Sequence, residues 1–435
     1  MEYVPSQSYN LSRIVAGTKS ELQVSKISTP AVDRQTEELE KYRDEFIKII
    51  SETSLRPFNA KPIQDYCRTV QWHNDLVFDC SNLMGGEGNL RSQLLHCVRH
   101  AMLAGAALVL PKIPIRAQIQ SKSGPVIVHK YEEMDDMEYL FDKDLFYARL
   151  GEACPQLKIY NSRRAIPGPG QVVNAEWGWK QVWNATLPGA IRRWERYYKR
   201  WRVPPPNITM VDLAVHLNIG DICTHGPDFA NSFGQILASH PEAYRVAAAV
   251  LFELSYQYKL AFDPSSMFMK DAYLGIHLRT AADAVKFHFL DFETQAQRYQ
   301  ELAKAADLPV IYVASGNQSS IRMFAALVAP TPVVTKYTLL RDTYELDTLR
   351  AMTWDQQGLV DTIVLMKSSM FLGMNSSSMS WNVAKTRQAM LPQGVCSGQK
   401  ETPRRFENGN SLVDELSVII GEGQRYDLDI GVWPS

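Results

Sequence analysis

The sequence predicts an α/β protein built from two Rossmann-like, doubly wound domains that face each other across a cleft. Between residues 75 and 113, a strand-like stretch, a glycine-rich loop, a helix-like stretch and a second strand-like stretch follow one another. From Tyr273 onward, strand-like and helix-like stretches alternate regularly. This rhythm is typical of parallel sheets covered by helices. We place the two domains at residues 1–265 and 266–435.

The bulk composition agrees with such a fold and excludes several classes of partner. The chain has 435 residues, enough for more than one domain, and 45% hydrophobic with 21% charged residues is an ordinary soluble composition. The net charge of −1 creates no basic field that would attract nucleic acid or an anionic membrane. An anionic ligand must therefore be held by a local site.

The cysteines and the first residues predict a reduced, cytoplasmic protein. The opening stretch MEYVPSQSYNLSRIVAG lacks the basic and apolar regions of a signal peptide, and no run of about 18 apolar residues occurs. The six cysteines show no metal-binding or disulfide spacing: Cys67, Cys80, Cys97, Cys154, Cys223 and Cys396.

The first half contains one clear βαβ unit. Apolar residues at helical spacing predict an amphipathic surface helix over 36–53. A strand at 75–80, a helix after the glycine loop and a strand at 106–113 then require a right-handed crossover. The organisation of 115–265 cannot be assigned. Its Trp- and Arg-rich stretch, 177–206, fits arginine stems packed on tryptophan better than RNA or membrane contact.

The second half predicts strands at 273–279, 308–315, 331–337 and 370–374, and helices at 292–306, 319–329, 346–369 and 375–390. Doubly wound sheets bind ligands at the carboxyl ends of their strands. Polar residues at these ends are therefore candidates for the functional site.

The glycine loop, GGEGNLR from Gly85 to Arg91, lies between a strand end and a helix start. Unpaired N–H groups and the positive end of a helix dipole favour phosphate at such a place, and glycine permits close approach. The pattern matches neither the dinucleotide fingerprint nor a P-loop. An ordinary tight connection is the alternative.

Two further candidates follow strands of the second half. His277 and Arg279 are two apart and share one face of a strand, where arginine offers paired donors to diphosphate oxygens. A structural salt bridge is the alternative for Arg279. The hydroxyls of residues 376–380 can cap a helix and donate to phosphate, and capping alone explains only one of them.

These pieces, in this order, resemble the GDP-fucose O-fucosyltransferase superfamily of GT-B glycosyltransferases. GGEGNLRSQL is similar to its glycine loop, YLFDKDLFYARLGEACPQLKI to its F-D-x-(D/E)-x-F segment, and GIHLRTAADA to its H-L-R strand. IYVASGNQ and LVDTIVLMKSSMFLGMNSSSMSW resemble two further blocks. The five motifs cover roughly residues 76–159 and 273–387.

The resemblance implies a GT-B fold with a GDP-sugar donor, no metal and no other cofactor. Asp142 and Asp144, which could pass for a metal-binding pair, fall in a structural segment of the family. Arg279 would neutralise the leaving β-phosphate, and we assign Glu87 as the catalytic base; a glutamate that merely complements the helix dipole is the alternative. The implied donor-binding residues are Gly86, Gly88, Asn89, Arg91, His277, Asp283, Ser315, Asp361, Ser376, Ser377 and Ser378.

The predicted function is an inverting glycosyltransferase that moves a fucose-like deoxyhexose or related sugar from a GDP-sugar to a hydroxyl. The missing signal peptide and disulfide framework favour a small-molecule acceptor, such as a secondary metabolite. The alternatives are a nucleocytoplasmic protein O-fucosyltransferase and an inactive relative that binds a nucleotide sugar. We expect no nucleic-acid partner and no membrane span.

Overall fold

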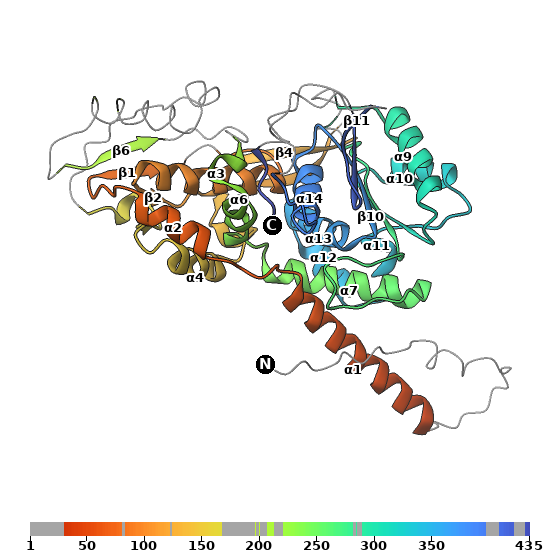
Figure 1. Ribbon diagram of the computed structural model, residues 1–435. Coiled ribbons are helices and arrows are strands. Elements are labelled where there is room, and N and C mark those ends of the chain that lie inside the picture. The colour runs from red at the N-terminus through yellow and green to blue at the C-terminus, as the bar shows by residue number, and fades with distance from the viewer. Residues whose placement is uncertain are drawn as a thin grey trace, which may run out of the picture.

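The computed structural model describes residues 30–80, 83–121, 124–167, 196, 200, 207–212, 221–281, 284, 289–396, 409–421 and 431–435. Within them the chain is a mixed α/β structure with two parallel sheets and many helices (Figure 1). The α/β class and the parallel sheets are confirmed. The arrangement as two GT-B domains facing a cleft, divided at residue 265, stays a prediction.

The first sheet has four parallel strands in the order β5-β2-β1-β6. The predicted βαβ unit is present as β1 (Leu76–Asp79), α3 (Glu87–Ala104) and β2 (Ala107–Val109). All four residues of β1 are buried, as expected for a central strand. The remaining elements of this half are α2 (Lys61–Thr69), α4 (Lys143–Ala153), β5 (Ile159–Tyr160), β6 (Thr209–Asp212) and α6 (Pro227–Phe233), with short 3-10 helices η3 (Met137–Tyr139), η4 (Arg163–Ala165), η6 (Ile222–His225) and η7 (Gly234–Ile236).

The second sheet has six strands in the order β11-β12-β10-β7-β8-β9, parallel except for the edge pair β11–β12. Its strands are β7 (Leu274–His277), β8 (Ile311–Ala314), β9 (Val333–Val334), β10 (Met370–Met374), β11 (Asn410–Val413) and β12 (Ser417–Ile420). Its helices are α9 (Phe292–Ala306), α10 (Gln318–Leu327), α11 (Lys336–Leu339), α12 (Glu345–Ala351), α13 (Trp354–Lys367) and α14 (Ser378–Gln388).

One predicted helix of the second half is wrong in extent. The stretch 346–369 forms two helices, because Thr353 interrupts it and starts α13 with a capping box: its side chain accepts from Gln356 N–H, and the Gln356 side chain accepts from Thr353 N–H. The other predicted helices and strands of this half are present, although the strand at 331–337 shrinks to β9.

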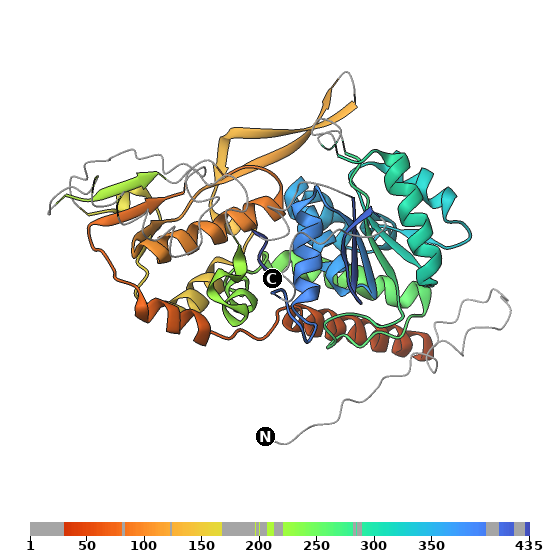
Figure 2. The ribbon, with the colours of Figure 1, turned by 45° about the horizontal axis from the view of Figure 1, so that its top comes forward.

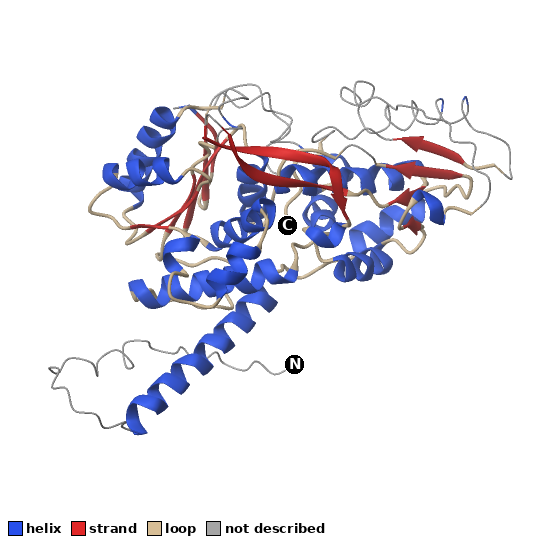
Figure 3. Cartoon of the chain, turned by 180° about the vertical axis from the view of Figure 1, so that it is seen from behind, coloured by secondary structure: helices blue, strands red, loops and turns tan. Residues whose placement is uncertain are grey.

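Two helices and a hairpin of the first half of the sequence lie toward the second sheet. The predicted surface helix is α1 (Pro30–Thr53), which packs on α7 (Pro241–Tyr258), and α7 in turn contacts α11, α12 and α13. The antiparallel hairpin β3–β4 (Ile113–Ser121 and Gly124–Asp135) extends from the first half toward the second sheet (Figures 2 and 3). The Trp- and Arg-rich stretch 177–206 lies almost wholly outside the described residues.

Apolar packing is continuous between the halves. The largest buried cluster contains residues of β1 and α3 from the first half, and of α13 and α14 from the second. A second cluster fills the opposite face of the second sheet, under α9 and α10. No helix among the described residues is both long and apolar enough to cross a membrane.

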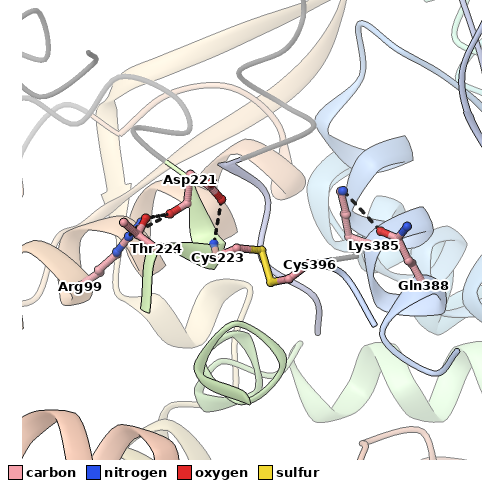
Figure 4. The surroundings of a disulfide bond; sticks show 7 residues. All are labelled: Arg99, Asp221, Cys223, Thr224, Lys385, Gln388 and Cys396. Atoms are coloured by element: carbon pink, nitrogen blue, oxygen red, sulfur yellow. Dashed lines mark hydrogen bonds between the residues drawn. A yellow bond between two sulfur atoms is a disulfide. The ribbon is translucent and has the colours of Figure 1, made fainter. Parts of the chain in front are cut away.

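The cysteines contradict the predicted reduced chain, because all six are paired. Cys67–Cys154 joins α2 to α4, and Cys80–Cys97 joins the end of β1 to α3. Cys223–Cys396 joins the two halves of the sequence (Figure 4). The paired Cα atoms are 5.7, 6.1 and 5.7 Å apart. The sequence separations of 87, 17 and 173 residues form no recognisable spacing, so only the fold reveals the pairs.

Candidate active site

The candidate site is centred on the carboxyl end of β7 and the N-terminus of α14. His277 ends β7, and its Nδ1 lies 2.9 Å from Ser380 Oγ. The same oxygen accepts a hydrogen bond from Met374 N–H, at the end of the neighbouring strand β10. His277 is therefore fixed by α14, and two predicted phosphate-handling segments lie side by side.

The serine run divides between one buried capping position and two half-buried positions. Ser377 is the N-cap of α14, where its side chain accepts from Ser380 N–H at 3.4 Å. Ser376 Oγ donates to Asn375 Oδ1 at 3.2 Å. Ser376 and Ser378 are half-buried, and Ser377 is buried. Capping thus engages Ser377, while Ser376 and Ser378 lie at the dipole-positive end of the helix.

Arg279 follows β7 and has its backbone fixed by one glutamine. Gln295 of α9 accepts from Arg279 N–H at 3.0 Å and donates to the Arg279 carbonyl at 3.1 Å. The guanidinium lies over the ring of Phe289, with 5.9 Å between its carbon and the ring centre. This places the predicted charge-neutralising residue at the same sheet edge as His277. Asp283, four residues on, lies outside the described residues.

The glycine loop meets this edge from the other half of the molecule. A side chain at Gly88 would put its Cβ 2.8 Å from the backbone nitrogen of Met379 and 2.9 Å from the carbonyl carbon of Ser378. Only glycine allows so close an approach. The N-termini of α3 and α14 therefore converge, so that the predicted segments around Gly88 and Ser378 are in contact.

The other two glycines of the loop are explained by backbone conformation and by close neighbouring side chains. Gly85 adopts a φ of +99°, which side chains rarely tolerate, and a Cβ there would clash with Asn89. A Cβ on Gly86 would lie 2.7 Å from Arg116 Nη2. The half-buried Asn89 stays in the first turn of α3, one residue beyond Gly88.

Glu87, the predicted base, is buried between α3 and α13. Its side chain is 5% exposed, Oε1 accepts from Thr362 Oγ1 at 2.9 Å, and Oε2 has no hydrogen-bond partner among the described residues. Burial raises the pKa of Glu87 to about 7, and the neighbouring Asp355 carboxylate adds to the rise. The Thr362 hydrogen bond and the Arg91 and Arg116 charges oppose it. A carboxyl with this pKa exchanges its proton near neutral pH.

Two predicted donor-binding residues are used for packing. Arg91 is 4% exposed and donates to the carbonyl oxygens of Gly234, Trp433 and Pro434. Asp361 is 8% exposed and accepts from Tyr312 Oη at 2.6 Å while it forms an ion pair with Lys336. Because these groups are buried and already engaged, the geometry does not support donor contact for either residue.

Ser315 remains beside the site. It follows β8, and its Oγ accepts from Asn317 N–H at 3.2 Å. Asn317 caps α10 and donates through Nδ2 to the Thr280 carbonyl at 3.3 Å, which ties the ends of β8 and β7 together. Ser315 is therefore held near the end of the strand that carries His277.

One buried ion pair next to the loop was not predicted from the sequence. Arg116 Nε, at the base of the hairpin, donates to both carboxylate oxygens of Asp355 at 3.1 and 3.0 Å. Arg116 is 8% and Asp355 1% exposed. The pair fastens β3 to α13 directly against Gly86, across 239 residues of sequence.

The Asp142–Asp144 pair has a structural role at Asp142. The Asp142 side chain caps α4 by accepting from Leu145 N–H at 2.9 Å. Among the described residues, no group of three or more histidine, cysteine, aspartate or glutamate side chains could hold a metal ion.

Comparison with known proteins finds similarity only among solved structures. No family model matches the sequence, and no curated protein matches it. The crystal structure of POFUT1 in complex with GDP-fucose matches with a TM-score of 0.45 and 11% identity, covering 81% of this chain and 100% of that one. NodZ α-1,6-fucosyltransferase co-crystallised with GDP matches with a TM-score of 0.38 and 13% identity, covering 73% and 93%.

Both are fucosyltransferases. The function proposed for this chain rests on its own residues.

Proposed function

We propose that this chain is an inverting glycosyltransferase that moves fucose, or a related deoxyhexose, from a GDP-sugar to a hydroxyl acceptor. The observation that carries the proposal is the contact of Gly88 with the N-terminus of α14. It brings two helix N-termini together beside the strand end that bears His277 and precedes Arg279. Converging N–H groups, serine hydroxyls and an arginine form a set of donors suited to a diphosphate.

Arg279 has the main catalytic role in this proposal. When the bond between sugar and diphosphate breaks, negative charge grows on the departing β-phosphate. A fixed guanidinium stabilises that charge more strongly in the transition state than in the ground state. The two hydrogen bonds with Gln295, one accepted and one donated by its side chain, fix the Arg279 backbone, which limits reorganisation during the reaction.

Glu87 is the proposed proton acceptor for the attacking hydroxyl. Its raised pKa, about 7, suits a general base near neutral pH. Its Oε2, which accepts no hydrogen bond from the part of the chain that the structure describes, is the atom that would take the proton. Because Glu87 is buried against Thr362, we assign it a smaller contribution than Arg279.

The three disulfides change the proposed compartment and weaken the case for a small acceptor. Disulfides persist in oxidising compartments and are rare in the cytosol. We therefore propose that the chain folds in an oxidising compartment. The expectation of a small-molecule acceptor rested partly on unpaired cysteines, so a hydroxyl of a disulfide-containing protein domain is an equal candidate.

The test is nucleotide binding followed by turnover. We expect GDP to raise the melting temperature in the presence of EDTA, and UDP to raise it much less. With GDP-fucose and EDTA, GDP release should be measurable and should fall about 100-fold or more in Arg279→Ala. Arg322→Ala, at an exposed position of α10, controls for the loss of charge.

Three outcomes separate the proposals. Binding of GDP without any release from GDP-fucose, with protein or small acceptors, would indicate an inactive relative that binds nucleotide sugars. Turnover that requires Mn²⁺ would refute the metal-free mechanism. Equal stabilisation by GDP and UDP would remove the proposed donor.

A further inference from the structure

A cavity lies between the two halves of the molecule. It is lined by Lys367 at the end of α13 and Thr386 near the end of α14, and across from them by Arg56, Arg91 and Arg149. Thr386 follows Ser378 by eight residues, which is about 12 Å along a helix, whereas Arg91 is only three residues beyond Gly88 on α3. The lining contains neither His277 nor Arg279 nor the serines 376–378, so the cavity is a different site from the proposed donor site.

Four cations border this cavity, and main-chain oxygens of the described residues accept their hydrogen bonds. Arg91 donates to the carbonyls of residues 234, 433 and 434, and Arg149 to that of Gln235. Arg56 donates to the main-chain oxygens of residues 231 and 435, and Lys367 to that of Ser266. Each cation thus has a main-chain partner and carries more N–H groups than these bonds use.

None of these four cations forms an ion pair with an acidic side chain of the described residues. The acidic side chains that influence them lie farther away: Glu87 for Arg91, Asp142 and Glu152 for Arg149, and Asp263 for Lys367. Burial lowers the pKa of Arg56 and of Arg91 to about 10, and that of Lys367 to about 8. Buried charges in proteins are normally compensated, because an unpaired one is costly to desolvate.

We propose that this cavity binds a small oxyanion, namely a carboxylate or a phosphate-like group. Its volume of about 30 Å³ admits a group of a few atoms and excludes a nucleotide. Guanidinium groups are well suited to such anions because they present paired donors in a plane. The anion would join cations from α3 and α4 to Lys367 of α13, and so link the two halves.

The anion that we propose is a free one from solution. Ser435 forms part of the cavity wall, and its main-chain oxygen accepts from Arg56 Nε at 2.6 Å. Ser435 is held there by its N–H, which donates to Thr386 Oγ1 at 2.8 Å, and by its Oγ, which donates to Asn382 Oδ1 at 3.0 Å.

Thermal unfolding of the full chain in sodium phosphate, sodium acetate and sodium chloride at constant ionic strength tests the proposal. For a free anion we expect the melting temperature to rise and saturate with phosphate or acetate at low millimolar concentration. Arg149→Met should weaken the apparent Kd about tenfold or more, because it removes charge-assisted hydrogen bonds. Methionine keeps an apolar stem over Phe58, and Arg322→Met, on exposed α10, should behave as wild type.

The proposal fails if neither phosphate nor acetate raises the melting temperature saturably compared with chloride. It also fails if the anion effect saturates but Arg149→Met leaves the apparent Kd unchanged. Arg56→Met replaces Arg149→Met if the latter does not fold, because Arg56 borders the same cavity.

Discussion

Acid should destabilise the protein through a cluster of buried, neutral histidines. His96 and His100 lie on α3, and His225 ends η6; Arg99 lies among them and over the ring of Trp433. Burial, reinforced by the Arg99 charge, lowers the pKa of His100 and of His225 from 6.5 to about 3, and that of His96 well below its ordinary value. The folded protein therefore keeps these rings uncharged at pH values where the unfolded chain protonates them.

The sign and size follow from proton linkage. Because the folded pKa is depressed, the stabilisation is present above pH 6.5 and is lost as the pH falls toward 3. Each such histidine loses about 1.4 kcal/mol for each pH unit below its unfolded value. Between pH 7.5 and 5.5 the three together cost about 4 kcal/mol. Glu87 has a pKa raised to about 7, so its protonation on acidification stabilises the folded protein by about 2 kcal/mol over the same range.

Urea unfolding between pH 7.5 and 5.5 measures these effects. We expect wild type to lose about 2 kcal/mol in net free energy of unfolding over this range. His100→Gln should reduce the slope of the free energy of unfolding against pH by the equivalent of about one bound proton. This holds whatever the substitution does to stability at pH 7.5. Glu87→Gln should steepen the dependence, because it removes the opposing group. A wild-type stability that is flat or rises on acidification, with His100→Gln unchanged in slope, would refute the assignment of neutral buried histidines.

Three other predictions concern the site and the covalent links. Arg279→Ala should reduce turnover about 100-fold or more, and Arg279→Lys should recover only part of the lost turnover. Glu87→Gln should lose less turnover than Arg279→Ala. Steady-state kinetics at saturating donor would contradict this if the turnover of Arg279→Ala stayed within about threefold of wild type. Gly88→Ala should cost about 1–3 kcal/mol and lower donor affinity, because its Cβ would press on the backbone of α14. Gly151→Ala, where a Cβ meets nothing within 4 Å, is its control in the same denaturation and binding assays. Mild reduction should open the Cys223–Cys396 disulfide first, because its two cysteines are half-buried while the other four are buried. Mass mapping of alkylated cysteines would contradict this if another disulfide opened first.

The sequence alone predicted the structural features that depend on local residue patterns. Period and glycine placement predicted the βαβ unit and most elements of the second sheet, and the strand-end positions of His277 and Arg279 followed from them. The prediction of one continuous helix over 346–369 was wrong because a capping box at Thr353 starts a new helix despite the continuous apolar spacing. The prediction of unpaired cysteines was wrong because pairing depends on which segments the fold brings side by side. Cys223 and Cys396 show this at a separation of 173 residues.

The residues that surround Glu87 show why the rest of the site could not be read in advance. Thr362 and Asp355 come from α13, and Arg116 comes from the base of the hairpin. Glu87 and Thr362 are 275 residues apart, so no spacing relates them. A motif can reveal that a glutamate starts a helix beside a glycine loop, but its pKa is set by burial against the other half of the chain. The chemistry proposed for Glu87 is thus a property of the junction between the halves, and any change that separates α3 from α13 should return its pKa toward that of an exposed carboxyl.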